Sequence, residues 1–373
     1  MARWLLGLKR DELSAQKTFR MLNAFILHKG DLLQQKRLSA AEMAHLRLAA
    51  GAAMLKICEQ KGVGDQFTAD QFYNLSHLMV DEVPQVREAF ALKLHKGLSK
   101  GIPNKCLPLD FMGMYALAGR EPDRRIRGAA RQYMLADVVR RREYVRNITV
   151  GTKVERAVSQ LPHILPDYML VFAVPVLTHD PAFTAYDNIT QLKVVKNCLW
   201  FVLEPLITRN DFYCYGFYKS LIERMKLHKD AVNEADDAFN YKLWAVCDLA
   251  MSVVWSRSSS YELRDFPSDA RIPTMYFAPQ PEYFANTRVF LPPELQFQPK
   301  RQTTTEVSAR GKKRPRIVVE RENANDVELT VGRSGSIDAK PSEASDTQIQ
   351  LLELEQPPET ELDEPQAKRA IAD

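Results

Sequence analysis

The stretch Val86-Arg87-Glu88-Ala89-Phe90 is the middle one of three similar stretches that lie forty residues apart. The other two are Leu46-Arg47-Leu48-Ala49-Ala50 and Ile126-Arg127-Gly128-Ala129-Ala130. In each stretch an apolar residue precedes an Arg, and Ala or Phe follows it. A period of about 40 to 47 residues is typical of arrays of paired helices, in which each pair buries its apolar face by stacking on the next.

This spacing predicts an all-α chain, a HEAT/armadillo-type α-solenoid of stacked helical pairs that is followed by a disordered C-terminal tail. The stack offers a long surface for a partner, so the architecture favours binding over catalysis. We expect Arg47, Arg87 and Arg127 to form a structural ladder that holds neighbouring repeats together rather than to contact a partner.

Local signals place several of the helices. Thr68-Ala69-Asp70-Gln71 has the pattern of a capping box, and Pro84 suits the first turn of a helix, where its missing N–H costs nothing. Pro108 to Ala118 is expected to form a helix that ends at Gly119. A further helix is expected from Arg124, with Asp123 as its cap, to about Val139.

Composition divides the chain into three parts. Residues 1–271 form the expected HEAT-repeat solenoid, and residues 272–298 contain Pro-Pro and aromatic residues that predict an extended segment packed on the array. Residues 299–373 contain no Phe, Tyr or Trp, so this tail is expected to stay disordered, with a basic cluster and an acidic end. The longest apolar run is too short to span a membrane, so no membrane partner is expected.

Several blocks of residues give this chain a resemblance to a known family. They include Leu46 to Gly51, Arg141-Arg142-Glu143-Tyr144, Leu177-Thr178-His179-Asp180-Pro181 and Cys198 to Phe201 with Leu203-Glu204. In order and spacing they resemble the C-terminal part of the HEAT-repeat array of the precocious-dissociation-of-sisters (Pds-five) cohesin regulators, over roughly residues 1–285. The resemblance implies a nuclear, non-catalytic scaffold that binds the kleisin subunit of cohesin and controls its retention on or release from chromatin in mitosis.

The resemblance also implies a Wapl-type release factor as a partner, and chromatin as an indirect one. The chain begins at Met1 inside the array, so we expect the N-terminal site that the family uses for Wapl-type factors to be absent.

Catalytic and metal-binding motifs are not found in this sequence. It has no phosphate-binding Gly-rich loop, no His-Glu-x-x-His and no Gly-x-Ser-x-Gly, and its five Cys residues form no Cys-x-x-Cys pair. We therefore expect no enzyme, no cofactor and no metal site.

A cluster of arginines is the main candidate for partner binding. Apart from the ladder residue Arg127, it consists of Arg124, Arg125, Arg131, Arg140, Arg141, Arg142 and Arg146. Only Asp137 and Glu143 oppose them between Arg124 and Arg146, so part of this charge is expected to face water, an acidic partner segment or a nucleic acid. These three interpretations stay open, and the alternative to a cohesin regulator is a nucleic-acid-binding or adaptor protein that uses this surface.

A second basic cluster lies in the tail. Lys312, Lys313, Arg314 and Arg316 flank Pro315 and form a compact basic motif of the kind that import receptors bind. This motif predicts localisation in the nucleus.

Overall fold

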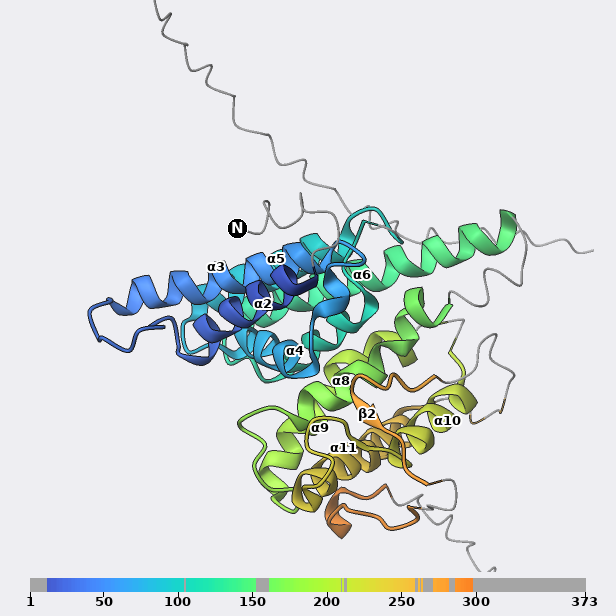
Figure 1. The fold of residues 1–373 in the computed structure, drawn as a ribbon. Coiled ribbons are helices and arrows are strands. Elements are labelled where there is room, and N and C mark those ends of the chain that lie inside the picture. Colours follow the sequence, from blue (N-terminus) through green and yellow to red (C-terminus); the bar gives the residue numbers. More distant parts are fainter. Residues whose placement is uncertain are drawn as a thin grey trace, which may run out of the picture. The chain divides into compact units, whose positions relative to one another are not determined.

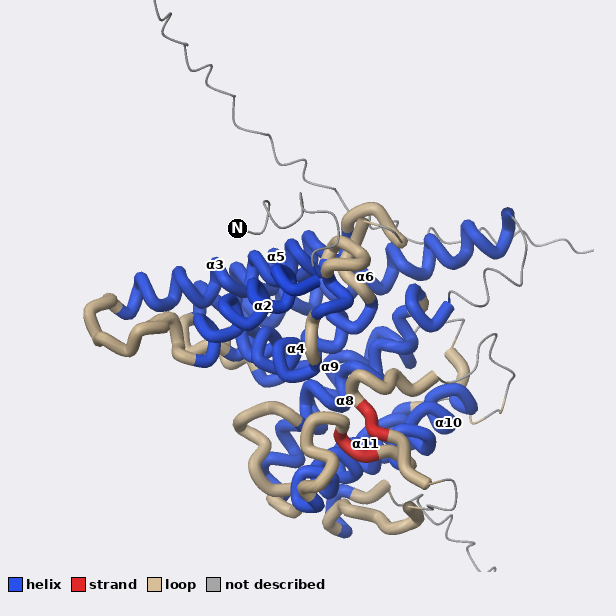
Figure 2. The backbone as a smooth tube through the Cα atoms, viewed as in Figure 1, coloured by secondary structure: helices blue, strands red, loops and turns tan. Residues whose placement is uncertain are grey.

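Helices form nearly all of the regular structure, as the ribbon and the tube show (Figures 1 and 2). The computed structural model describes residues 12–103, 105–151, 161–208, 210, 213–258, 261, 263, 271–281 and 286–297. Within these ranges the only strands are two of two residues each, so the predicted all-α solenoid class is confirmed. Among the described residues, none of the helices combines the length and the apolar character that a membrane span requires. The predicted disordered tail lies outside the described residues.

The helices and strands are numbered in the order in which they occur along the chain. The α-helices are α2 (Glu12–Leu27), α3 (Ala40–Cys58), α4 (Ala69–Ser76), α5 (Pro84–Ser99), α6 (Arg124–Gly151), α8 (Met169–Thr178), α9 (Ile189–Ile207), α10 (Tyr215–Lys226) and α11 (Asp237–Arg257). The 3-10 helices are η1 (Gly64–Gln66), η2 (His77–Val80), η3 (Leu109–Arg120), η4 (Pro166–Tyr168) and η5 (Pro293–Leu295), and the strands are β1 (Lys229–Asp230) and β2 (Phe277–Ala278).

The ends of the first helices follow the local signals of the sequence. The Thr68 hydroxyl accepts a hydrogen bond from the Gln71 backbone N–H, and the Thr68 backbone N–H donates to the Gln71 side-chain oxygen, so the predicted capping box is confirmed. Pro84 stands in the first turn of α5, as expected. Ser39 forms a second capping box, which starts α3.

The helices α3, α5 and α6 pack side by side in sequence order. Their C-terminal halves are linked by polar contacts, since Lys100 Nζ lies 2.7 Å from Glu59 Oε1 of the α3 end and Arg140 Nη1 donates to the Ser99 carbonyl at 2.5 Å. These contacts connect α5 to α3 and α6 to α5. The three stretches around Arg47, Arg87 and Arg127 lie in these three helices.

The helix expected from Pro108 to Ala118 is a 3-10 helix, η3, and it continues to Arg120. Gly119 does not end it. A Cβ at Gly119 would lie 2.5 Å from the Cα of Cys198 in α9, and a Cβ at Gly113 would lie 2.7 Å from the backbone of Phe172 in α8. These glycines let η3 approach two other helices closely, so tertiary packing explains them better than a helix-terminating role.

Helix α6 also differs from its expected bounds, because it continues past Val139 to Gly151. Its inward positions continue at helical spacing through Met134, Val138 and Arg141 to the half-buried Val145. One of these inward positions is an arginine, which the apolar pattern of the sequence does not reveal.

The segment that contains β2 packs against helices from distant parts of the chain. β2 pairs antiparallel with β1, with Asp230 opposite Phe277. The buried ring of Tyr276 lies 5.0 Å from that of Phe72 and 5.8 Å from that of Phe172, and its hydroxyl donates to Asp110 Oδ2 at 3.1 Å. The segment boundaries expected at residues 271 and 298 stay predictions.

Candidate partner-binding site

Arg47, the first residue of the predicted ladder, is buried and holds a carboxylate from the next repeat. Its Nε and Nη2 donate to the two carboxylate oxygens of Asp81 at 2.7 and 2.9 Å, and its Nη1 donates to the Lys29 carbonyl at 2.7 Å. The hydrogen bonds to Asp81 raise the pKa of Arg47 above its ordinary value. The paired geometry is the strong, planar form of the arginine–carboxylate interaction.

Arg87 repeats this arrangement one repeat later. Its Nε and Nη2 donate to Glu121 at 2.6 and 2.9 Å, and its Nη1 donates to the Asp81 carbonyl at 2.7 Å. In both cases the carboxylate stands 34 residues after the arginine. Among the described residues, Arg127 keeps only the backbone bond, to the Glu121 carbonyl at 3.0 Å, and the position 34 residues further is Leu161, which has no carboxylate.

Two further pairs extend the ladder beyond the residues that the sequence suggested. Arg120 donates to Asp180 at 2.8 Å, and Nε2 of His179 lies 2.8 Å from Oδ1 of the buried Asp230. The His179 ring also stacks on Tyr73, with 3.6 Å between ring centroids. The partners are 60 and 51 residues apart, so a search for a fixed period of forty misses them.

The four carboxylates share a second contact. Each accepts a hydrogen bond from the backbone N–H two residues further along, at the joint before the next segment. The pairs are Asp81 with Val83 at 2.9 Å, Glu121 with Asp123 at 3.0 Å, Asp180 with Ala182 at 3.0 Å and Asp230 with Val232 at 3.0 Å. Each carboxylate therefore orders its own joint while it binds a side chain from another repeat.

The arginines of α6 that were predicted to bind a partner occupy several environments. Arg125 forms an exposed two-point pair with Glu88 of α5, one bond of which measures 2.7 Å. Arg131 is half-buried and donates to Glu204 of α9 at 2.5 Å. Both side chains are already engaged within the chain, so they are poorer candidates for partner contacts.

Arg142 is also directed inward. Its Nη1 donates to the Pro205 carbonyl at 3.3 Å, and its Nη2 lies 3.6 Å from Asp167 Oδ2. The Tyr218 hydroxyl donates to the other oxygen of this buried carboxylate at 2.6 Å. Arg142 thus compensates a buried charge rather than facing a partner.

Asp167 should make the stability of the chain depend on pH. Burial raises the pKa of Asp167, against the opposing effects of Arg142 and the Tyr218 hydrogen bond. The native state therefore holds the proton more tightly than the unfolded chain. Tighter proton binding by Asp167 stabilises the folded chain below about pH 4. As the pH rises from there towards the raised pKa, this stabilisation is lost and the free energy of unfolding should decrease.

The Asp167→Asn variant cannot titrate at this position, so it should lack that contribution. Its free energy of unfolding relative to the unsubstituted chain should increase as the pH rises above about 4. Urea unfolding at a series of pH values between about 4 and 7 measures this difference. A difference that is constant with pH would contradict the raised pKa.

Arg141, a member of the predicted partner-binding cluster, does not lie on an exposed surface. Its side chain is buried, with 1% of the residue exposed, because position 141 continues the inward stripe of α6. Its Nη2 donates to the Leu107 carbonyl at 3.1 Å. Burial lowers the pKa of Arg141 from its ordinary value.

The exposed cations of this region lie on the row α3, α5 and α6. Arg124, Arg140 and Arg146 of α6 are exposed. Between Arg140 and the end of α3 we define the basic face as Lys56, Lys93, Lys96, Lys100 and Arg140, all of them exposed. A hollow of about 500 Å³ lies at its edge and is lined by Lys56, Glu59, Gln60, Lys61, Lys100, Gly101 and Lys105. Lysines outnumber acidic side chains here, so the site favours an anionic partner.

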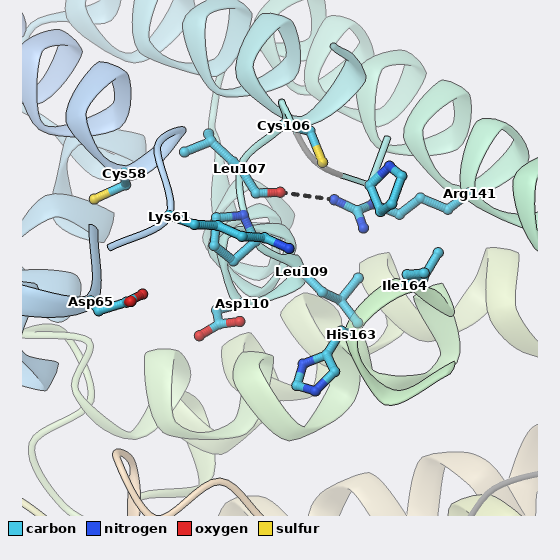
Figure 3. A pocket seen from close by; sticks show the side chains of 12 residues that line it. Cys58, Lys61, Asp65, Cys106, Leu107, Leu109, Asp110, Arg141, His163 and Ile164 are labelled. Atoms are coloured by element: carbon cyan, nitrogen blue, oxygen red, sulfur yellow. Dashed lines mark hydrogen bonds between the residues drawn. The ribbon is translucent and has the colours of Figure 1, made fainter. Parts of the chain in front are cut away.

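Arg141 lines a second pocket, of about 390 Å³, which shares Lys61 with this hollow (Figure 3). The pocket lies between the end of α3, the joint before η3 and the residues around Ile164. Its polar side chains are Lys61, Asp65, Asp110, Arg141 and His163, together with the thiols of Cys58 and Cys106. Burial raises the pKa of both thiols, which leaves them protonated and poorly reactive.

Comparisons with known proteins place the chain in a family. The family model described as sister chromatid cohesion protein PDS5 matches residues 1–278. The chain belongs to the PDS5 family. The family resemblance inferred from the sequence is thereby confirmed.

Individual PDS5 relatives agree with the family model. The human protein PDS5 homolog B is 38% identical over 311 residues, which cover 82% of this chain and 21% of that protein. PDS5 homolog A of Gallus gallus is 37% identical over 295 residues, which cover 79% of this chain and 21% of that protein. The chain spans about a fifth of the length of these relatives.

The PDS5-like blocks of the sequence supply internal contacts of the fold. The block from Leu177 to Pro181 contributes His179 and Asp180, and both belong to the extended ladder. The block that ends in Glu204 contributes the partner of Arg131. These two blocks therefore help to hold the helices together.

The remaining predicted sites give two results. The predicted import motif, which comprises Lys312, Lys313, Arg314 and Arg316, lies outside the described residues. Across the described ranges, no group of three or more His, Cys, Asp or Glu side chains is arranged to hold a metal ion.

Proposed function

We propose that this chain is a non-catalytic scaffold that regulates sister chromatid cohesion. It binds cohesin through the kleisin subunit and influences whether cohesin stays on chromatin or is released in mitosis. Membership of the PDS5 family carries this proposal, since the matched relatives are named sister chromatid cohesion proteins. The basic motif around Pro315 supports a nuclear location, and a Wapl-type release factor is a further partner by family resemblance.

The basic face is the best candidate for the kleisin contact. Packed helices lie about 8–10 Å apart, and an extended peptide advances about 3.3 Å per residue. An acidic residue at every third position of an extended segment would therefore meet the cations of α3, α5 and α6 in turn. Within the described chain, Lys93 and Lys96 make no ion pair, so their charge is available to such a segment.

Reversing charge on this face should weaken binding to the kleisin subunit. In the double variant Lys96→Glu/Arg140→Glu, two attractive contacts become repulsive, and we expect the dissociation constant to increase at least tenfold, equivalent to about 1.4 kcal/mol. Fluorescence anisotropy with a labelled kleisin fragment at moderate salt measures the change.

Lys193→Glu is the matched control, because Lys193 is also exposed but lies on α9. It should bind the kleisin fragment like the unsubstituted chain. Equal binding by all three proteins would remove the basic face from the proposal, and failure of the unsubstituted chain to bind would remove the kleisin partner.

Direct binding of nucleic acid through the same region is the second candidate, since the exposed arginines of α6 suit phosphates as well as carboxylates. In that case the affinity for a DNA duplex should fall steeply with salt. The slope of log K against log salt should lessen by about one for each cation removed in Lys96→Glu/Arg140→Glu. A weak, salt-insensitive interaction with DNA would exclude this candidate.

A further inference from the structure

The buried guanidinium of Arg141 lacks a carboxylate partner. In the described part of the chain, no carboxylate lies within the 4.0 Å of an ion pair from it. Its Nη2 donates to the Leu107 carbonyl and its side chain contacts Cys106, while its Nε–H, also buried, has no hydrogen-bond acceptor. A buried charge with an unused donor is costly, and Asp137, Asp110 and Cys106 offset this cost only in part, since burial still lowers the pKa of Arg141. An added anionic group beside the guanidinium would therefore stabilise it.

The pocket around Arg141 has the features of a built binding site. Its volume of about 390 Å³ lies in the range of ligand pockets, and Leu109 and Ile164 contribute apolar walls. Lys61 and His163 are exposed at its opening, while Arg141 forms part of its interior (Figure 3). A ligand that enters past Lys61 would meet a cation at both ends of its path.

The acidic side chains of the pocket restrict the charge of this ligand. Asp65 accepts the Gly62 backbone N–H at 3.1 Å, and Asp110 accepts the Tyr276 hydroxyl. Both carboxyl groups line the same space as Arg141, so a multiply charged phosphate would be repelled there. A ligand with one negative charge and nearby N–H donors can pair with the cations Arg141 and Lys61. Its N–H groups can at the same time donate to the carboxyl oxygens of the pocket.

We propose that this pocket binds the side-chain carboxylate of an acidic peptide from a partner protein. The carboxylate accepts hydrogen bonds from Arg141 and Lys61. The planar guanidinium of Arg141 and the rotatable ammonium group of Lys61 can both donate to carboxylate oxygens. Backbone N–H groups of the peptide face Asp110 and Asp65, and Leu109 and Ile164 cover its apolar atoms. None of the five residues of the basic face lines this pocket, although Lys61 lines both the pocket and the hollow at the edge of the face. Loss of kleisin binding in Lys96→Glu/Arg140→Glu would therefore leave this proposal standing.

The test uses the full chain with ¹⁵N-labelled arginine and two small probes that differ in one group. They are N-acetyl-glutamate α-amide, which carries the carboxylate, and N-acetyl-glutamine α-amide, which carries an isosteric amide. For a probe of this size a dissociation constant of about 1 mM is expected. The Nε–H signal of Arg141 should shift saturably with the first probe, and the second should bind at least fivefold more weakly.

Two variants keep the test independent of whether Arg141 can be replaced. Lys61→Glu and His163→Glu alter exposed side chains at the opening, so they should fold, and each should weaken the carboxylate probe at least fivefold. Lys193→Glu should leave its binding unchanged. Equal binding of both probes, no shift of the Arg141 signal, or a stronger effect of inorganic phosphate would each overturn the proposal.

Discussion

Replacing Asp81 with Ala is expected to destabilise the chain by about 3–5 kcal/mol, because it removes the buried carboxylate that pairs with Arg47 and leaves the largely exposed Glu82, 3.5 Å from Arg47 Nη2, to offset the charge. Arg47 and Asp81 have side-chain exposures of 5% and 6%, and two hydrogen bonds join them. The same substitution removes the acceptor for the Val83 N–H, which orders the joint before α5. Urea unfolding followed by circular dichroism measures the loss.

Glu88→Ala is the control for this prediction. It removes an arginine–carboxylate pair of similar geometry between α5 and α6, but Glu88 and Arg125 are largely exposed, with side-chain exposures of 40% and 67%. Solvent screens such pairs, so its unfolding midpoint should change little. If Asp81→Ala were as mild as Glu88→Ala, the ladder would not hold the repeats together.

The double variant Arg47→Met/Asp81→Leu separates the cost of an unpaired charge from the value of the pair. Removing both charges leaves no buried ion behind, so this variant should be more stable than Asp81→Ala. A double variant less stable than Asp81→Ala would indicate that loss of packing dominates at this site.

Replacing Tyr276 with Ala is expected to have an effect of similar size, a loss of about 3–5 kcal/mol. Tyr276 is 1% exposed, and its ring packs between Phe72, Tyr73 and Phe172, which belong to helices far apart in the sequence. The cavity left by Ala would remove these contacts together, and Asp110 would lose its hydroxyl donor. Thermal and urea unfolding measure the loss.

Tyr276→Phe isolates the hydroxyl of this side chain. It retains the ring and removes only the hydrogen bond to Asp110, so a loss of about 1–2 kcal/mol is expected. The contrast between the two variants tests whether ring packing anchors the segment around β2. If Tyr276→Phe and Tyr276→Ala lost the same stability, the hydrogen bond to Asp110 and not the packing of the ring would hold this segment.

Helical periodicity predicts most of the fold where local signals dominate. The capping box at Thr68 and the helix start at Pro84 are both present, because each depends on residues within one turn. The prediction is wrong where a distant element decides the outcome. At Gly119 the close approach of Cys198 in α9 replaces the expected helix end, and no local pattern announces a neighbour 79 positions away.

The candidate site was less accessible to sequence reasoning than the fold. Eight arginines between Arg124 and Arg146 look equivalent in the sequence, yet Arg141 is buried while Arg140 is exposed. A signal for the difference does exist, since position 141 lies seven residues after the buried Met134, in the same helical stripe. A search for apolar residues at helical spacing misses this position, because arginine is charged.

The all-α class, the repeat spacing and the PDS5 resemblance can be read from the amino-acid sequence, because they follow from local periodicity and from blocks of residues. The partner of each ladder side chain comes from the tertiary structure, since Arg120 and His179 meet carboxylates 60 and 51 residues away across packed helices. The tertiary structure also decided that Arg141 lines a pocket while Arg140 faces solvent. Burial and pairing depend on how helices stack, and stacking brings together residues that the chain keeps apart.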